Sequence, residues 1–341
     1  MRPVATDEHA EIAAILQELG VDPADVPDSL ADGAAMASDV VFSRGDVFSL
    51  RDVAEKIGEK PEDVAEGFRH LGIKTTDYDE ARFGERDVTF AAFLRDAIAD
   101  ILTDDEGQEI LHVAGTALAS IAEAAIANHV QGPERRTNNM VENARLNAFV
   151  SELGLSLSDF LSVAFRHHLR QAMLVNRRTQ HDEHRELVTL SIGFLDLVGF
   201  TALSQQLAIS DLVELVKVFE RRAHELAHEC HTRIVKLIGD EVMFVAEYPA
   251  DAARFVGGMT AALADDKVVP RGGLAFGDLV NVHGDYFGPV VNLAARLTDT
   301  AVPGEVLVDD SIAAQLPTEP AGRRMLKGFD EPVRVHTLRE G

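Results

Sequence analysis

The sequence predicts two structural classes in one chain: an all-helical first part, residues 1–176, and an α+β second part, residues 187–341. Apolar residues recur at helical spacing in the first part, whereas strand-like and helix-like runs alternate after residue 187. The polar segment 177–186 between them is the predicted linker. Because 46% of the 341 residues are hydrophobic, each part has enough apolar side chains for its own core.

The first part contains helix start and stop signals in chain order. A short helix is expected over Glu8–Leu19, ending at Gly20. Residues 48–72 predict two helices around a turn at Gly58, with Ser49 as the N-cap of the first and Pro61 opening the second. Further helices are expected over Phe90–Leu102, Gln108–His129 and from Glu134 to about Asn176, the last interrupted at Gly154 and Ser156–Asp159.

The second part predicts a mainly antiparallel sheet with helices on one face. Leu187–Leu195 is typical of a buried strand, and Ser210–Cys230 of an amphipathic helix. A hairpin is expected around Gly239 and Asp240. The elements that follow are a helix over Ala250–Leu263, strands near Gly272–Phe276 and Leu279–Val282, a helix over Val290–Leu297, a strand over Glu305–Val308 and a closing strand within Phe329–Leu338.

Charge and composition limit the possible partners. The net charge is −25, of which −18 falls on residues 1–130, a surface that repels nucleic acid and anionic lipid. The longest uncharged apolar run, Ile110–Ala122, is shorter than the roughly 20 residues of a membrane span, so no span is expected. No signal peptide is recognisable, and a lone cysteine, Cys230, fits a cytoplasmic protein.

The pair of helices predicted over residues 48–72 resembles a helix-turn-helix, which offers an alternative function as a DNA-binding regulator. The presumed recognition helix, Glu62–Leu71, carries three acidic residues and one arginine, where phosphate contacts require basic side chains. A helical hairpin that serves packing is therefore favoured.

Two aspartates stand at the ends of apolar strand-like runs. Asp196 lies in Phe194–Thr201 and Asp240 in Lys236–Glu241, where a carboxylate can project from a rigid edge. Carboxylate oxygens bind hard cations such as Mg²⁺, and two of them suffice for a pair of ions acting on a phosphate. An aspartate beside a glycine is also a common turn former, so either residue alone would be weak evidence.

The helix predicted over Val290–Leu297 places Asn292 and Arg296 at positions i and i+4 on one face. An amide and a guanidinium group on that face could bind ribose and phosphate oxygens. A salt bridge would use the same arginine equally well.

Taken together, three motifs resemble the signature of the class III nucleotidyl cyclases. They are Phe194-x-Asp-x-x-Gly-Phe-Thr201, Lys236-x-x-Gly-Asp240 and Gly288-x-x-Val-Asn-x-Ala-Ala-Arg296. Leu326–Val333 is similar to the closing segment of that family. The resemblance covers residues 187–338 and implies a ferredoxin-like α+β catalytic domain, two Mg²⁺ or Mn²⁺ ions per active site, and a cyclisation that releases pyrophosphate.

The resemblance also implies a role for each matching residue. Asp196 and Asp240, with the carbonyl of Leu197, match the metal ligands. Lys236 and Asp285 match the pair that selects the base; an ammonium donor and a carboxylate acceptor suit adenine, so ATP is favoured and a guanylate cyclase is the alternative within the family. Asn292 and Arg296 match the transition-state residues, and Lys327 lies where a contact to the terminal phosphates is expected.

In that family the active site is shared between two cyclase domains, so a chain with a single such domain is expected to form a head-to-tail homodimer. The arrangement of a helical part before one cyclase domain resembles soluble bacterial cyclases whose first domain inhibits activity and senses acid. Six histidines near the junction could provide such a pH switch: His112, His129, His167, His168, His181 and His184. An apolar small ligand, for example a fatty acid, is a further possibility for the helical part.

Overall fold

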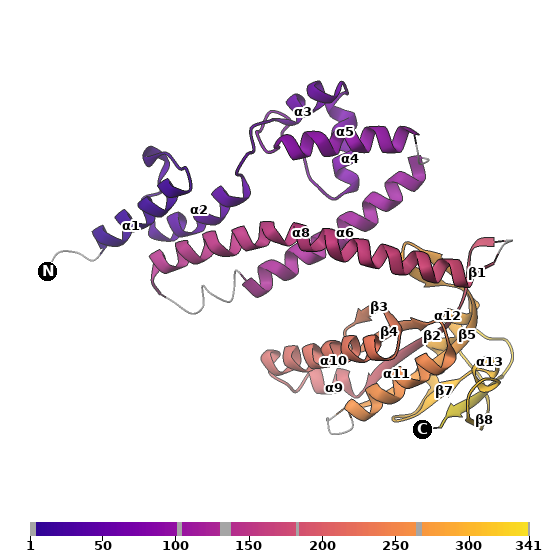
Figure 1. Ribbon diagram of the computed structural model, residues 1–341. Helices are drawn as coiled ribbons and strands as arrows, with labels where there is room; N and C mark the ends of the chain where they lie inside the picture. Colours follow the sequence, from indigo (N-terminus) through magenta and orange to yellow (C-terminus); the bar gives the residue numbers. More distant parts are fainter. Residues whose placement is uncertain (1–4, 101–103, 130–137, 182–183, 264–267, 340–341) are drawn as a thin grey trace. The chain divides into compact units, whose positions relative to one another are not determined.

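Figure 1 shows a computed structural model of the chain, which describes residues 5–100, 104–129, 138–181, 184–263 and 268–339. Residues group into two units, Met1–His167 and His168–Gly341. The helix α8 (Met140–Thr179) crosses this division and continues through the first residues of the predicted linker. The domain limits set from the sequence at 176 and 187 stay a prediction.

The described residues of the first unit form helices, which confirms its predicted class. Two apolar clusters hold it together: one centred on Leu50, Phe68 and Phe83, and a second that joins Ile12 and Leu16 to the start of α8. Its helices before α8 are α1 (Ala5–Glu18), the 3₁₀ turn η1 (Pro23–Asp25), α2 (Leu30–Phe42), α3 (Leu50–Ile57), α4 (Pro61–His70), α5 (Glu85–Asp100) and α6 (Asp104–His129). Helix α2 and the turn η1 were not expected from the sequence.

Helices α3 and α4 begin and end where the sequence predicts. Ser49 caps α3 in a reciprocal capping box, because its side chain accepts from the amide of Asp52 while the Asp52 carboxylate accepts from the amide of Ser49 at 2.8 Å. Gly58 ends α3 with φ +75°, a conformation that favours glycine, and Pro61 opens α4.

The expected interruption at Gly154 and Ser156–Asp159 is wrong, because α8 runs unbroken through both. The two serine hydroxyls that could have capped a new helix donate back into this one, from Ser156 to the carbonyl of Glu152 and from Ser158 to that of Leu155. Serine satisfied in this way is compatible with a helix interior.

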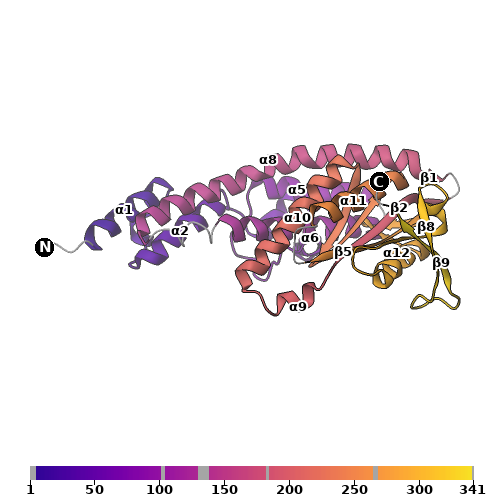
Figure 2. The same ribbon diagram turned by 90° about the horizontal axis from the view of Figure 1, so that it is seen from below.

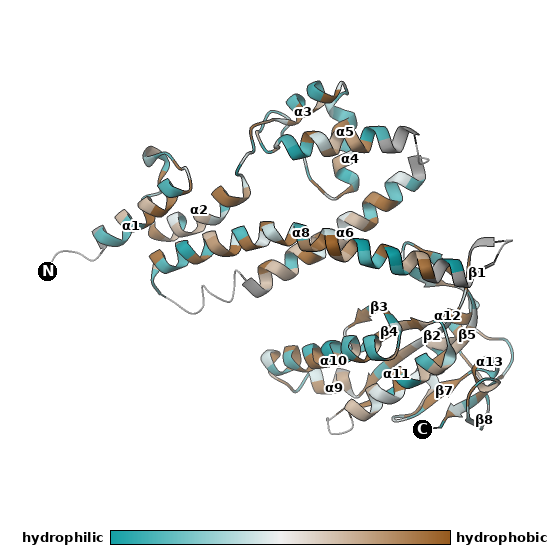
Figure 3. Ribbon diagram, viewed as in Figure 1, coloured by the Kyte–Doolittle hydropathy of each residue, from teal (hydrophilic) through white to brown (hydrophobic). Residues whose placement is uncertain are grey.

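By length and composition, Glu106–Ala127 in α6 and Met140–Leu174 in α8 could each cross a membrane, which differs from the expectation of no span. Figure 3 shows apolar residues along both helices. Most are exposed, among them Ile110, Leu118, Phe160 and Phe165. Two helices of this kind are weak evidence for a membrane, since contacts between proteins cover the same kind of surface.

The second unit is built on a nine-stranded sheet in the order β3-β4-β2-β5-β7-β9-β8, with β1 paired to β2 and β6 to β5. All pairs are antiparallel except β5 with β7. The strands are β1 (Gln180–His181), β2 (His184–Val198), β3 (Thr232–Ile238), β4 (Glu241–Ala246), β5 (Val269–Val282), β6 (Asp285–Phe287), β7 (Val306–Val308), β8 (Thr318–Arg324) and β9 (Val333–Leu338). The predicted α+β class with a mainly antiparallel sheet is confirmed.

Helices cover both faces of the sheet, so the expectation of helices on one face is wrong. Helices α10 (Ile209–Glu229) and α11 (Pro249–Ala262) pack against Leu195 and Phe244 on one face. Helix α12 (Pro289–Thr300) packs against Ile192 and Met243 on the other, as Figure 2 shows. Alternate residues of β2 point to opposite faces of the sheet, and both sets include apolar side chains. Each face of the strand therefore needs a layer that shields it from water. Short helices α9 (Phe200–Ser204) and α13 (Asp310–Ala313) complete the unit.

The two strands expected around residues 272–282 are one strand, β5. Gly277 and Asp278, which lie between the two expected strands, are paired with Leu190 and Thr189 of β2. The Thr189 hydroxyl donates to the Asp278 carboxylate at 2.6 Å. Pairing with a 15-residue strand therefore overrides the local turn preference.

Candidate active site

The sheet brings Asp196 and Asp240 together at one end. Asp196 lies near the end of β2, directly opposite Glu241, the first residue of β4. Asp240 and Gly239 form a two-residue loop between β3 and β4, and Gly239 adopts φ +64° as such loops require. The amide of Leu197 donates to the carbonyl of Asp240 at 3.2 Å, which ties the two segments to each other.

Negative charge is concentrated around this pair. Burial raises the pKa of Asp240 above its ordinary value, and the neighbouring Asp196 carboxylate raises it further. The pKa of Glu241 is also raised, first by burial and then by Asp196, Asp299 and Asp240. Carboxylates that disfavour one another in this way attract a cation. The chemistry of the donor set therefore fits a hard divalent metal.

Among the described residues, no group of three or more His, Cys, Asp and Glu side chains is arranged to hold a metal ion. The carboxylate ligands predicted from the sequence are Asp196 and Asp240. Leu197, whose carbonyl is the predicted third ligand, directly follows Asp196, and its amide donates to the carbonyl of Asp240.

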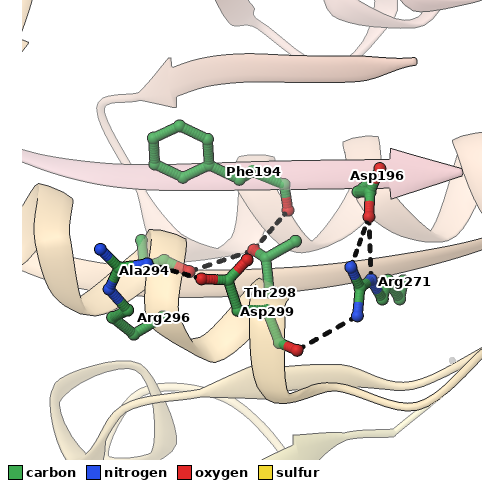
Figure 4. A network of polar contacts seen from close by, with 7 residues as sticks. All are labelled: Phe194, Asp196, Arg271, Ala294, Arg296, Thr298 and Asp299. Atoms are coloured by element: carbon green, nitrogen blue, oxygen red, sulfur yellow. Dashed lines mark hydrogen bonds and ion pairs between the residues drawn. The ribbon is translucent and has the colours of Figure 1, made fainter. Parts of the chain in front are cut away.

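Arg271 of β5 contacts Asp196 and was missed from the sequence. Figure 4 shows its guanidinium group directed at the Asp196 carboxylate, with Nε and Nη2 donating to Oδ2 at 2.9 and 2.7 Å. Its Nη1 donates to the carbonyl of Asp299 in α12 at 3.1 Å. The register that places Arg271 opposite Asp196 joins residues 75 positions apart, so no local pattern indicates it.

Lys236 and Asp285 also meet in the structure. Lys236 lies on β3 and Asp285 begins β6, and the ammonium nitrogen is 2.5 Å from Oδ2 of Asp285. Oδ1 of Asp285 accepts from the amide of Tyr286 at 2.8 Å, which fixes the carboxylate. Both side chains remain partly exposed, at 40% and 31%. One donor and one acceptor are thus held side by side within reach of solvent.

Helix α12 carries Asn292 and Arg296 and is fixed closely to the sheet. The Thr298 hydroxyl lies 3.3 Å from the carbonyl of Phe194 and 3.0 Å from that of Ala294. A Cβ atom at Gly273 of β5 would lie 2.4 Å from the Ala294 carbonyl oxygen, so only glycine permits this approach. The helix position is therefore set by β2 and β5, the strands that carry Asp196 and Arg271.

Arg296 does not contact either metal-site aspartate within the described part of the chain. Its Nη1 is 2.7 Å from Oδ2 of Asp299, three residues later on α12 (Figure 4). Asn292 is exposed on the same helix, and Lys327 is exposed in the turn between β8 and β9. Within one copy of the chain, Arg296 of α12 is therefore not in contact with the pair formed by Asp196 and Asp240.

The six junction histidines do not form one cluster where the structure describes them. His112 contacts His70 of α4, which was not among the predicted histidines. Nδ1 of His70 lies 2.9 Å from Nε2 of His112. His167 and His168 are exposed on α8. The side chains of His129, His181 and His184 lie outside the described residues.

A hollow of about 360 Å³ lies between α1 and α8 in the first unit. Its lining combines the apolar Ile15 and Leu19 with the charged Glu11, Glu18 and Arg145. This mixed lining does not single out an apolar ligand, and the fatty-acid hypothesis stays a prediction.

Comparison with known proteins places the chain among relatives of similar length. No family model matches it. An uncharacterized protein of Mycobacterium tuberculosis is 32% identical, with 98% of this chain and 91% of the relative aligned. A Streptomyces coelicolor protein named adenylate cyclase is 30% identical, with 87% and 80% aligned. A pH-sensitive adenylate cyclase of M. tuberculosis is 28% identical, with 99% and 89% aligned.

Among solved structures, an adenylyl cyclase of P. aeruginosa is similar over 46% of this chain and 95% of its own. The TM-score is 0.41 and the sequences are 24% identical.

Proposed function

This chain belongs to the adenylate cyclase family, and we propose that it converts ATP to 3′,5′-cyclic AMP and pyrophosphate. The ribose 3′-hydroxyl gives its proton to Asp196 or to water, and its oxygen attacks the α-phosphorus in line. The bond from the α-phosphorus to the oxygen that bridges to the β-phosphate breaks, and pyrophosphate leaves with the electron pair. The observation that carries the proposal is the pairing of Asp196 with Asp240 beside Arg271, at the end of a sheet that also presents Lys236 with Asp285.

The aspartate pair would hold two Mg²⁺ or Mn²⁺ ions, together with the carbonyl of Leu197. Metals bound there would neutralise triphosphate charge and would favour ionisation of the 3′-hydroxyl. The raised pKa of Asp240 supports this assignment, because a carboxylate that is partly buried and also faces Asp196 is stabilised in its charged form by a bound cation. Metal binding also explains how a chain of net charge −25 accepts a triphosphate.

Lys236 and Asp285 would select the base. The Lys236 ammonium can donate to N1 of adenine, and the Asp285 carboxylate can accept from the N6 amino group. Guanine presents a donor at N1 and an acceptor at O6, the opposite of what the pair offers. The 2.5 Å contact between the two side chains supports this role, because it holds donor and acceptor adjacent before nucleotide arrives. This favours ATP over GTP.

Asn292 and Arg296 would act on the same nucleotide from a second copy of the chain. Asn292 would orient the ribose, and Arg296 would stabilise the charge that develops on the α-phosphate. In one copy Arg296 is paired with Asp299 and, among the residues that the structure describes, contacts neither Asp196 nor Asp240. A head-to-tail homodimer would complete two equivalent sites.

Regulation by pH is part of the proposal. The helical first unit would restrain the dimer at neutral pH, and protonation of histidines near the junction would release it. The name of the pH-sensitive relative supports this, as does the contact of His112 with His70, whose ring nitrogens lie 2.9 Å apart. The same activity from pH 5.5 to 8 in the full chain and in a chain beginning at residue 187 would rule it out. We further propose that the enzyme acts in the cytoplasm.

The direct test measures turnover of ATP and GTP in Mg²⁺ and Mn²⁺ by the wild type and by Asp240→Ala. We expect cyclic AMP from the wild type, little cyclic GMP, and no product from the variant. Asp211→Ala, at an exposed aspartate in the first turn of α10, is the matched control and should retain activity. Absence of cyclic product, or an unaffected Asp240→Ala enzyme, would reject the mechanism.

The alternative function as a DNA-binding regulator is not supported by α4, the presumed recognition helix. Its first turn carries the acidic residues Glu62 and Asp63, which repel the phosphates of DNA.

A further inference from the structure

Arg271 binds the Asp196 carboxylate through one of its two oxygens. Two nitrogens of Arg271 donate to a single oxygen, Oδ2 of Asp196, and none of its contacts reaches Oδ1. Side-chain exposure is 27% for Arg271 and 18% for Asp196, so solvent competes little for this bond. One carboxylate oxygen is thereby held, while the other is left to a different ligand.

The third contact of Arg271 fixes the guanidinium group itself. Nη1 donates to the main-chain carbonyl of Asp299, in the last turn of α12, where carbonyls lack partners within the helix. A cation at a helix C-terminus is also favoured by the helix dipole. Arg271 therefore spans from the metal-site carboxylate to the helix that carries Arg296, whose own partner is the side chain of Asp299.

We propose that Arg271 is a positioning residue for metal binding. It clamps Oδ2 of Asp196 and anchors that clamp on α12, so that Oδ1 is presented to the metal in one orientation. This inference rests on the proposed function, since it assigns Asp196 as a metal ligand. Partners that orient a metal-binding carboxylate typically change metal affinity or activity 10- to 100-fold when they are replaced.

A positioning role and a purely electrostatic role of Arg271 predict opposite changes in metal affinity when Arg271 is replaced. A positive charge beside a metal site repels the metal, so loss of the charge alone would raise metal affinity. Loss of a clamp lowers it. Lysine keeps the charge of arginine but presents a single nitrogen, which cannot bind Asp196 and the Asp299 carbonyl in the same geometry.

The chain contains a matched control for this test. Arg324 is also 27% exposed, bonds a carboxylate, Glu305, at 2.9 Å, and donates through Nη1 to the Thr300 carbonyl at the end of the same helix. Neither Arg324 nor Glu305 belongs to the proposed metal site. Arg324→Lys therefore reproduces the structural cost of Arg271→Lys without the change at Asp196.

The experiment measures Mn²⁺ binding to the metal-free full chain, from the electron paramagnetic resonance signal of free Mn²⁺ during titration. We expect Arg271→Lys and Arg271→Gln to weaken Mn²⁺ binding at least about tenfold, and Arg324→Lys to bind within about twofold of the wild type. Circular dichroism establishes that each variant is folded. Unchanged affinity in Arg271→Lys, or tighter binding in Arg271→Gln, would overturn the inference.

A fourth variant separates this inference from the proposed function. Asp196→Ala should lose Mn²⁺ binding altogether. If it binds Mn²⁺ as the wild type does, the assignment of the metal site is wrong. If Asp196→Ala loses binding while Arg271→Lys does not, the metal site stands and only the positioning role of Arg271 fails.

Discussion

Replacing Gly273 with alanine should disable the enzyme through helix α12, without touching a residue of the proposed active site. A Cβ atom at this position would lie 2.4 Å from the carbonyl oxygen of Ala294, 2.5 Å from the amide nitrogen of Thr298 and 2.7 Å from Cβ of Leu297. Ordinary contacts of a Cβ atom begin near 3.4 Å. The backbone atoms of α12 cannot rotate away, so the helix must withdraw by about 1 Å.

A displacement of α12 by that distance should reduce the reaction rate strongly and the free energy of unfolding moderately. Misplacement of a catalytic group by about 1 Å can reduce the rate about 100-fold, and α12 carries both Asn292 and Arg296. Inserting a methyl group into a packed interface costs about 1–3 kcal/mol. The Thr298 hydroxyl, already 3.3 Å from the Phe194 carbonyl, would lose that bond.

Two quantities are measured for each variant. The first is kcat for cyclic AMP formation, at a temperature where the variant is folded, and the second is the midpoint of thermal unfolding. Gly257→Ala is the control, because a Cβ atom at Gly257 in α11 has no atom within 4 Å. It should leave kcat unchanged and stabilise the protein by up to about 1 kcal/mol. A folded Gly273→Ala enzyme with kcat within threefold of the wild type would refute the reasoning.

Three further predictions concern other parts of the chain. Exchanging the base-selecting charges, Lys236→Glu with Asp285→Lys, should shift the ratio of kcat/KM for ATP over GTP about 100-fold toward GTP, because each mismatched bond costs about 1–3 kcal/mol; an unchanged ratio would contradict the assignment. Burial raises the pKa of Glu241 above its ordinary value of 4.5. The folded state therefore disfavours the ionised side chain, and the protein loses stability as the pH rises above 4.5. Metal-free Glu241→Gln should therefore melt higher than the wild type at pH 7 and equally below about pH 4, and equal melting at both would contradict it. Ser49→Ala removes the capping box shared with Asp52 and should cost about 1 kcal/mol in urea unfolding; no loss would contradict the role of the cap.

Local signals in the sequence were sufficient for much of the fold. Ser49, Gly58 and Pro61 set the limits of α3 and α4, because caps and breakers act within a few residues. The hairpin at Gly239 and Asp240 formed for the same reason. Two of the errors arose where distant partners decide: the single strand β5 is imposed by its pairing with β2, and the cover of both sheet faces depends on where α12 docks.

The candidate site shows the same division. Asp196, Asp240, Lys236 and Asp285 stand in recognisable motifs, and the structure brings them together in two pairs. Arg271 stands in no such motif, and only the register of β5 against β2 reveals its contact with Asp196. His70 was missed for a similar reason, since its partner His112 lies 42 residues later on another helix.

The claim that each active site is shared between two copies of the chain is tested most directly by complementation. Asp240→Ala and Arg296→Ala should each be inactive alone, because each removes one half of both sites. When the two variants are co-expressed in equal amounts, half of the dimers are mixed and each mixed dimer regains one intact site. We predict about one quarter of the wild-type cyclic AMP formation per chain. Activity that stays at the level of the separate variants would contradict the shared site.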